Sequence, residues 1–214
     1  MVATSPTTTW TETRERKSLL ERARAFAVPV ALLGIMLLAA LLRFTGQDWD
    51  AGQNLHPDER FITMVATALQ WPSSPGQYFN TPDSTLNPYN FEYPTFIYGT
   101  FPLYAAKLYG QLTGHSEYGN FHLASRSVSA IFDLLTVFFL FLIGRRLFNA
   151  RIGLLASLLY ALSVHPIQLS HFGTFDLTAS ALCVMAFYFA IRADAIGRWG
   201  AFCLAGLMVG LAPG

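Results

Sequence analysis

The sequence has little charge: only 13% of its 214 residues are Asp, Glu, Lys or Arg, and the net charge is +1. Soluble domains carry about 25% charged residues, so this composition argues against a soluble protein. The near-neutral balance gives no reason to expect nucleic acid as a partner. Only two cysteines occur, Cys183 and Cys203, and both lie in apolar runs, which argues against a disulfide framework or a zinc site.

Several motifs that mark enzyme classes are also missing. The sequence has no glycine-rich phosphate loop, no His-Glu-x-x-His and no Gly-x-Ser-x-Gly. It has no internal repeat of fixed period either. Nothing in it indicates soluble nucleotide chemistry.

What the sequence does have is apolar residues, which make up 53% and fall in long uncharged runs. The first run, Ala25–Leu42, has 18 residues, enough to cross a bilayer core of about 30 Å. The pattern predicts an all-α fold, a polytopic membrane helical bundle with outward-facing juxtamembrane helices. We expect a basic cytoplasmic tail at residues 1–24 and, within residues 25–214, spans at about residues 25–44, 127–144, 152–168, 176–192 and 199–214.

The segment between the first two spans, residues 45–126, is predicted to be an outer loop with two surface helices. The first is expected at about residues 57–71 and the second at about 93–110. The second segment is rich in aromatic residues and interrupted by two prolines and a lysine, which favours the membrane interface. If it does not cross, the basic clusters at 145–151 and 192–198 lie on the cytoplasmic side with the N-terminus, as the positive-inside bias requires.

The stretch Asn54–Phe61 is the strongest candidate for a functional site. Pro57 followed by Asp58 and Glu59 is a helix-start signal. Carboxylates at that position can simply complement the helix dipole. Because they lie where the chain leaves the membrane, beside a histidine and an arginine, we favour a catalytic carboxylate at the membrane–water boundary.

Four further titratable residues have two interpretations each. Asp133 lies inside a span and is either a polar link between helices, which we favour, or part of a substrate groove. His165 and His171 are either structural or solvated, or ligands of a metal ion, which spacing alone supports weakly. Asp176 begins a span and is either a helix-start acid or part of the site near Asp58.

Five motifs follow one another along the chain in a familiar order and spacing. They are Pro57-Asp58-Glu59, Phe91-Glu92-Tyr93-Pro94, Arg126-Ser127-Val128-Ser129-Ala130, Gly144-Arg145-Arg146-Leu147-Phe148 and Ser170-His171-Phe172-Gly173-Thr174-Phe175-Asp176. From about residue 26 to its end, the chain resembles the bacterial membrane glycosyltransferases that use a polyprenyl-phosphate-linked sugar. These are relatives of protein O-mannosyltransferases and of the lipid A aminoarabinose transferase, with the C-type glycosyltransferase fold.

The resemblance implies that Asp58 is the catalytic carboxylate, with Glu59 beside it. It also implies that Glu92 takes part in the site and helps to hold a divalent metal ion, and that Asp176 lies nearby. Where the aminoarabinose relative has a lysine that contacts the lipid phosphate, this chain has Tyr93. Another cation is therefore expected to meet the phosphate, and the candidates are Arg60, Lys107, Arg126 or a residue beyond position 214.

The predicted site thus has Asp58 and Glu59 as catalytic residues. The predicted substrate-binding residues are Arg60, Glu92, Tyr93, Arg126, His171 and Asp176. The expected function is inverting transfer of a sugar from a polyprenyl-phosphate carrier to an acceptor hydroxyl, on the outer side of the bacterial cytoplasmic membrane.

The expected partners are the lipid-linked donor, membrane lipids and an acceptor that the sequence does not identify; a divalent metal ion is the only cofactor considered. The last apolar segment stops in mid-span, so we expect the chain to be the N-terminal part of a longer protein. Two alternatives stay open: a transporter or channel subunit, and an inactive truncated fragment.

Overall fold

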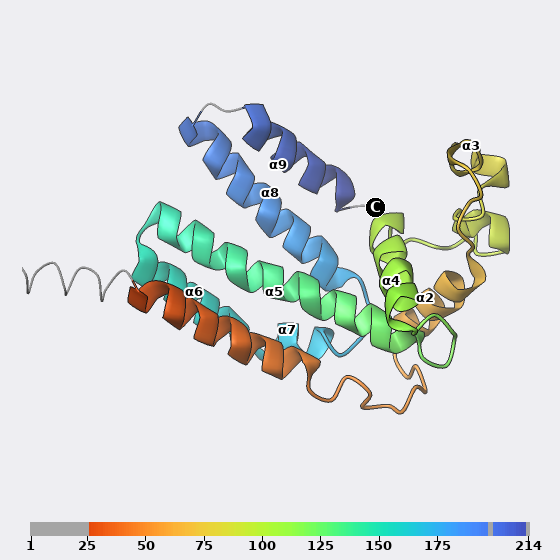
Figure 1. Ribbon diagram of the computed structural model, residues 1–214, viewed down its shortest axis with the longest axis horizontal. Coiled ribbons are helices and arrows are strands. Elements are labelled where there is room, and N and C mark those ends of the chain that lie inside the picture. Colours follow the sequence, from red (N-terminus) through yellow and green to blue (C-terminus); the bar gives the residue numbers. More distant parts are fainter. Residues whose placement is uncertain (1–25, 197–198, 213–214) are drawn as a thin grey trace, which may run out of the picture.

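The computed structural model describes residues 26–196 and 199–212, and the chain folds there entirely into helices and loops. The basic tail predicted at residues 1–24 lies outside the described residues. A bundle of long helices occupies one end of the molecule and a smaller group of short helices the other (Figure 1). This confirms the predicted all-α membrane bundle.

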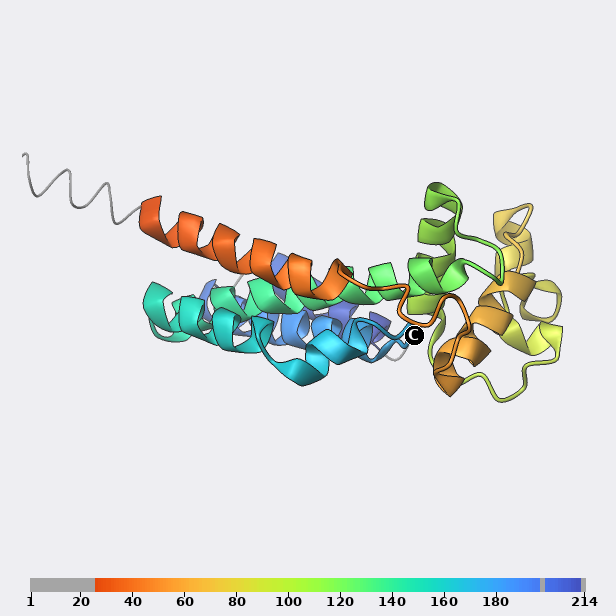
Figure 2. The same ribbon diagram turned by 90° about the horizontal axis from the view of Figure 1, so that it is seen from below.

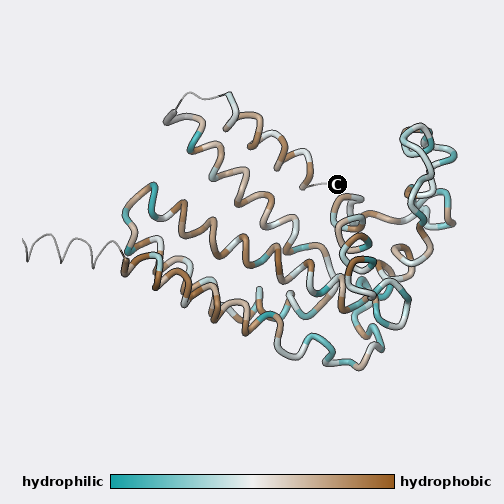
Figure 3. The backbone as a smooth tube through the Cα atoms, viewed as in Figure 1, coloured by the Kyte–Doolittle hydropathy of each residue, from teal (hydrophilic) through white to brown (hydrophobic). Residues whose placement is uncertain are grey.

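The bundle contains a first helix (Phe26–Phe44) and five later ones. These are α5 (Phe121–Leu147), α6 (Ala150–Ala161), α7 (Val164–Leu169), α8 (Asp176–Ile196) and α9 (Trp199–Leu211). Among the described residues, three helices are long and apolar enough to cross a membrane: Phe26–Phe44, Phe121–Leu147 and Asp176–Ala193. The apolar residues concentrate along this bundle, as the brown segments of Figure 3 show. The chain is a multi-pass membrane protein.

Two of the expected spans differ from the helices that form. The segment expected as one span at 152–168 consists of α6 and α7, separated by Leu162 and Ser163. Pro166 lies in the first turn of α7, where proline is tolerated because the first backbone N–H groups of a helix have no intrahelical partner. The segment expected at 199–214 is helical only to Leu211.

The helices outside the bundle form a head group of short elements. It comprises α2 (Pro57–Ala68), α3 (Pro75–Phe79), two 3₁₀ turns (Thr81–Asp83 and Pro88–Phe91) and α4 (Thr100–Thr113). In both views α4 crosses the end of the bundle instead of running along it (Figures 1 and 2). Its buried residues join those of α2 and α5 in one core around Ile62, Leu103 and Phe121.

The surface helix expected at 93–110 begins only at Thr100. Two residues explain the later start. Pro94 disfavours helical backbone at the residue before it, and Gly99 precedes the helix with φ 82°, a conformation that favours glycine. The helix expected at 57–71 starts at Pro57 as expected and ends at Ala68.

A buried ion pair links three helices inside the bundle. Arg43 and Asp133 are both fully buried, and the Arg43 Nε–H donates to the Asp133 carboxylate. The Tyr160 hydroxyl donates to the other oxygen of Asp133 at 2.6 Å. Arg43 also donates to the carbonyl of Ala161 at 3.1 Å. Asp133 therefore acts as the polar link between helices that the sequence analysis favours.

We predict that losing one partner of this pair destabilises the bundle far more than losing both. Asp133→Leu leaves the Arg43 charge buried without a counter-charge, which costs about 3–5 kcal/mol, whereas replacing both residues by leucine is close to neutral. The free energy of unfolding of each purified variant in detergent, compared with wild type, measures both effects. Equal destabilisation by the single and double variants would contradict this interpretation.

Candidate functional site

The centre of the candidate site is a buried arginine held by two carboxylates. Arg126 of α5 and Glu59 of α2 are both fully buried. The Arg126 Nε–H donates to Glu59 Oε1 at 2.7 Å and its Nη2–H to Oε2 at 2.6 Å. This forked geometry is the strongest form of a carboxylate–guanidinium contact. It fixes the start of α2 against α5.

Asp50 completes the arrangement from the loop after the first helix. Its two oxygens accept from Arg126 at 3.0 Å and 2.9 Å. Burial alone would raise the pKa of Asp50, but the hydrogen bonds from Arg126 and the Leu55 N–H lower it to about 2, with help from the charges of Arg126 and His122. The Arg126 guanidinium also lies 5.4 Å from the ring centre of Trp49. Every face of Arg126 is thus occupied by protein.

Gly173 connects this network to the segment before α8. Its N–H donates to Glu59 Oε1 at 2.8 Å. A Cβ at this position would lie 2.1 Å from Ser125 Oγ and 2.8 Å from Glu59 Oε1, so no larger residue fits. Glycine therefore lets the segment approach Glu59 closely enough to place the start of α8 beside the start of α2.

Asp58 and Asp176 lie close to the same tyrosine as a result. The Tyr98 hydroxyl hydrogen-bonds to Asp58. Burial, this hydrogen bond, and the negative charges of Asp58 and Asp176 raise the pKa of Tyr98. Asp58 is half-buried and Asp176 is exposed, so both remain accessible. Asp58 and Asp176 each lie in the first turn of their helix, where the helix dipole favours a negative charge.

A small groove opens beside this group. It has a volume of about 250 Å3 and is lined by Ile97, Tyr98, Phe175, Asp176, Ala179 and Ala212. Most of these side chains are apolar, while Tyr98 and Asp176 provide polar atoms. The arrangement can therefore place an apolar chain and a polar reacting group next to each other, with two carboxylates at hand.

The other predicted substrate-binding residues are placed differently. Arg60 is exposed, and its Nε–H donates to the Asn54 carbonyl at 3.1 Å. Glu92 is exposed with φ 68°, directly after the second 3₁₀ turn. Tyr93 packs edge-on against Phe61 of α2, with ring centres 5.9 Å apart. Among the described residues, no hydrogen bond or ion pair joins Arg60, Glu92 or Tyr93 to Asp58.

His171 has a bridging role in the structure. Its Nδ1 lies 2.7 Å from the Ile167 carbonyl and its Nε2 lies 2.8 Å from the Thr45 carbonyl. The carbonyl of His171 in turn accepts the Trp49 indole N–H at 2.9 Å. These contacts tie the α7–α8 segment to the end of the first helix. His165 has no side-chain contact of this kind in the described part of the chain.

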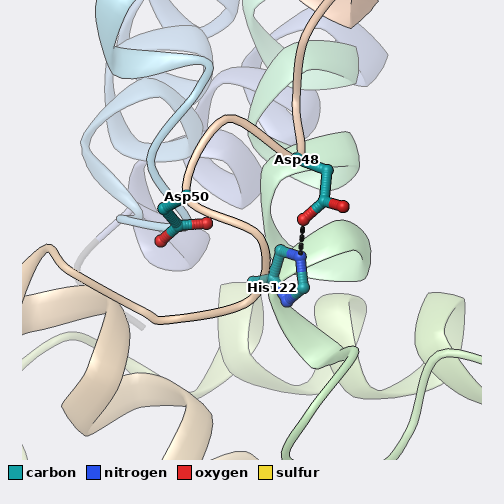
Figure 4. Close-up of side chains that lie close together, drawn as sticks. All are labelled: Asp48, Asp50 and His122. Carbon is teal, nitrogen blue, oxygen red and sulfur yellow. Dashed lines mark hydrogen bonds and ion pairs between the residues drawn. The ribbon is translucent and has the colours of Figure 1, made fainter.

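One cluster in the described residues has the composition of a metal site, and it differs from the predicted one. Asp48, Asp50 and His122 offer ligand atoms within 4.8 Å of one another. Figure 4 shows Asp48 and Asp50 on the loop and His122 on α5, with His122 Nε2 bonded to Asp48 at 3.0 Å. Both oxygens of Asp50 already accept from Arg126, a cation that opposes a metal ion there. Internal pairing explains this cluster, and the metal expected at Glu92 stays a prediction.

Sequence reasoning missed two residues that the fold brings to the site, Tyr98 and Asp50. Tyr98 is one of many aromatic residues in its segment, and no local pattern distinguishes it. Asp50 belongs to no helix-start signal. The sequence offers one weak signal for such an ion pair: an acid lies just after one membrane span, and an arginine lies at the start of the next span.

The fold and the site define a class: a polytopic helical membrane protein with carboxylates gathered at one end of the bundle beside a groove that has both polar and apolar walls. A family model described as dolichyl-phosphate-mannose-protein mannosyltransferase matches residues 101–213. The chain belongs to this family, and it is therefore a membrane glycosyltransferase with a polyprenyl-phosphate-linked sugar donor. No curated protein and no solved structure matches the chain significantly. Because the family match begins in α4, it leaves the roles of Asp58, Glu59 and Tyr98 to be argued from geometry.

We predict that Arg126→Lys unfolds the head group although it keeps the charge. Lysine cannot make forked contacts to two carboxylates, so Glu59 and Asp50 lose partners inside the protein. The expected cost is about 3–5 kcal/mol, seen as a lower unfolding temperature in detergent. Arg60→Lys is the matched control, because Arg60 is exposed and should change stability little. Equal stability of both variants would show that the Arg126 contacts are dispensable.

Proposed function

We propose that the chain transfers a sugar from polyprenyl phosphate to an acceptor hydroxyl at the end of the bundle where α2 and α8 begin. The observation that carries this proposal is the convergence of Asp58 and Asp176 on Tyr98, beside a groove with both polar and apolar walls. Transfer needs a base for the acceptor hydroxyl, stabilisation of the leaving phosphate and a surface for the prenyl chain.

Asp58 is our candidate for the general base. It is accessible, whereas Glu59 is fully buried and both of its oxygens are bonded to Arg126. We therefore assign Glu59 the role of a positioning residue that holds the start of α2. A single displacement at the anomeric carbon, with Asp58 accepting the proton of the acceptor hydroxyl, would invert the configuration of the sugar.

Tyr98 supports this role for Asp58. Its raised pKa favours the protonated hydroxyl, the form that can donate a hydrogen bond to the Asp58 carboxylate. A hydrogen bond to one oxygen orients the carboxylate, while the other oxygen stays available for the acceptor. Asp176, which lines the groove with Tyr98, is our candidate for binding sugar or acceptor hydroxyls.

Arg60 is our candidate for the contact to the leaving phosphate. Of the three cations considered, Arg126 is bonded to two carboxylates and Lys107 donates to the Ala66 carbonyl at 2.9 Å in a buried position. Burial also lowers the pKa of Lys107, which weakens it as a fixed cation. Arg60 is exposed two residues after Asp58, and its Nη atoms can extend toward an anion.

The transporter alternative has less support. It needs Asp133 or the histidines to line a pathway through the membrane. Asp133 is instead fully buried and paired with Arg43 and Tyr160, and His171 is bonded to two backbone carbonyls. The second alternative is an inactive truncated fragment. Sugar-transfer activity with a lipid-linked donor would distinguish a glycosyltransferase from such a fragment.

We predict that Asp58→Asn lowers the rate of sugar transfer by about two or more powers of ten, because the amide keeps the shape but cannot accept the proton. Release of labelled sugar from polyprenyl-phosphate donors, by protein reconstituted in vesicles, measures the effect. Asp83→Asn is the matched control: Asp83 is an exposed acid of the head group, bonded to Asn80 and outside the groove.

Asp176→Asn distinguishes the two carboxylates that approach Tyr98. If Asp58 is the base, Asp176→Asn should raise KM more than it lowers kcat. If Asp176→Asn removes turnover while Asp58→Asn retains it, the two roles are reversed. If wild-type protein shows no transfer with several donors, the proposed function is wrong.

The outward position of the site is also a proposal, and it follows from the distribution of positive charge. The C-terminal ends of α5 and α8 and the start of the first helix lie at the same end of the bundle, opposite the head group (Figure 1). Arg145, Arg146, Arg151 and Arg192 all lie at this end and are all exposed. Positive charge favours the cytoplasmic side, which places the head group outside.

We predict that a cysteine at Phe148, a highly exposed residue of the α5–α6 turn, is not labelled on whole cells by an impermeant thiol reagent. A cysteine at Glu117 in the exposed loop before α5 should be labelled strongly. Both changes are made with Cys183 and Cys203 replaced by alanine. The opposite labelling pattern would reverse the orientation.

A further inference from the structure

Two connected grooves lie at the end of the bundle opposite the carboxylates. The larger, of about 660 Å3, lies between the start of the first helix and the α5–α6 turn. The second, of about 550 Å3, continues between the first helix and the last turns of α5. They share Val28 and Ala150, and their walls are mainly apolar. Each also has one arginine at its margin: Arg151 in the first groove and Arg145 in the second.

Close packing of two glycines brings these arginines together. A Cβ at Gly144 would lie 2.7 Å from the Gly153 Cα, and a Cβ at Gly153 would lie 2.6 Å from the Phe141 carbonyl oxygen. The end of α5 and the start of α6 therefore touch backbone to backbone. This contact gathers the positive charges of the α5–α6 turn next to the two grooves.

Within the described residues, Arg145, Arg146 and Arg151 make no ion pair. The first two lie in the last turn of α5, where the helix dipole favours a cation. Arg151 is different because it lies in the first turn of α6, where the dipole disfavours a positive charge. An arginine at that position, beside an apolar groove and without a carboxylate, indicates an anion from outside the described chain.

We propose that these grooves bind an anionic phospholipid, with the phosphate between Arg145 and Arg151 and an acyl chain along Val28 and Leu32. Basic pockets between transmembrane helices are suited to anionic headgroups, because the cations attract the phosphate and the apolar walls accept the chain. The ligand is a structural lipid and not the sugar donor, because the site lies at the end of the bundle away from Asp58 (Figure 1). The proposal does not depend on the proposed function.

The test uses the full chain in phosphatidylcholine vesicles with a trace of photoactivatable phosphatidylglycerol. We expect cross-links in peptides that contain residues 27–32 and 149–154. Replacing Arg145 and Arg151 together by glutamine should lower the yield about tenfold, since each arginine contributes severalfold to attraction of an anionic lipid. The single variant Arg151→Lys, with Arg145 unchanged, should retain most of the yield because it keeps the charge.

Arg146→Gln is the matched control: it removes the same charge from the same turn, but Arg146 lines neither groove. Its yield should stay within about twofold of wild type. Three results would overturn the proposal: equal labelling by a phosphatidylcholine probe, equal loss in Arg146→Gln, or no loss in the double variant. Labelling that appears only after removal of residues 1–24 would show that the chain's own N-terminal segment occupies the grooves.

Discussion

The buried contact between Arg126 and two carboxylates is the interaction on which the head group depends. It joins the loop after the first helix through Asp50, the start of α2 through Glu59, and α5 through Arg126 itself. Burying three charges costs desolvation energy that only good geometry and complete hydrogen bonding offset. The forked contacts and the Gly173 N–H provide both. The network therefore tolerates few alternative arrangements, and it fixes segments that are far apart in the sequence.

This constraint also explains why the adjacent acids Asp58 and Glu59 have different environments and different proposed roles. Successive residues of a helix point about 100° apart, so when Glu59 faces Arg126 its neighbour Asp58 must face elsewhere. It faces Tyr98, on the side where α8 begins. Because Gly173 binds Glu59, the same network sets the position of Asp176. The proposed chemistry at Asp58 thus depends on a structural ion pair next to it.

The two ends of the bundle differ in chemistry in a way that suits a lipid-dependent enzyme. Carboxylates and a tyrosine gather at the end with the head group, whereas arginines gather at the other end, beside apolar grooves. Between them, Arg43 and Asp133 neutralise each other inside the bundle. The proposed general-base catalysis at one end and the proposed lipid binding at the other are compatible, because the intervening helices carry their remaining charges at their ends.

The sequence by itself determined the helical class, the apolar spans and the start of α2, because hydrophobic run length and the Pro57-Asp58-Glu59 signal are local properties. It also indicated the carboxylate-rich region of the site. Only the tertiary structure decided which of Asp58 and Glu59 is accessible, that Arg126 is a structural cation, and that Tyr98 and Asp50 belong to the site. It also decided that the second surface helix begins at Thr100. These features depend on contacts between residues distant in sequence, and local patterns carry no information about which partner a buried charge will meet.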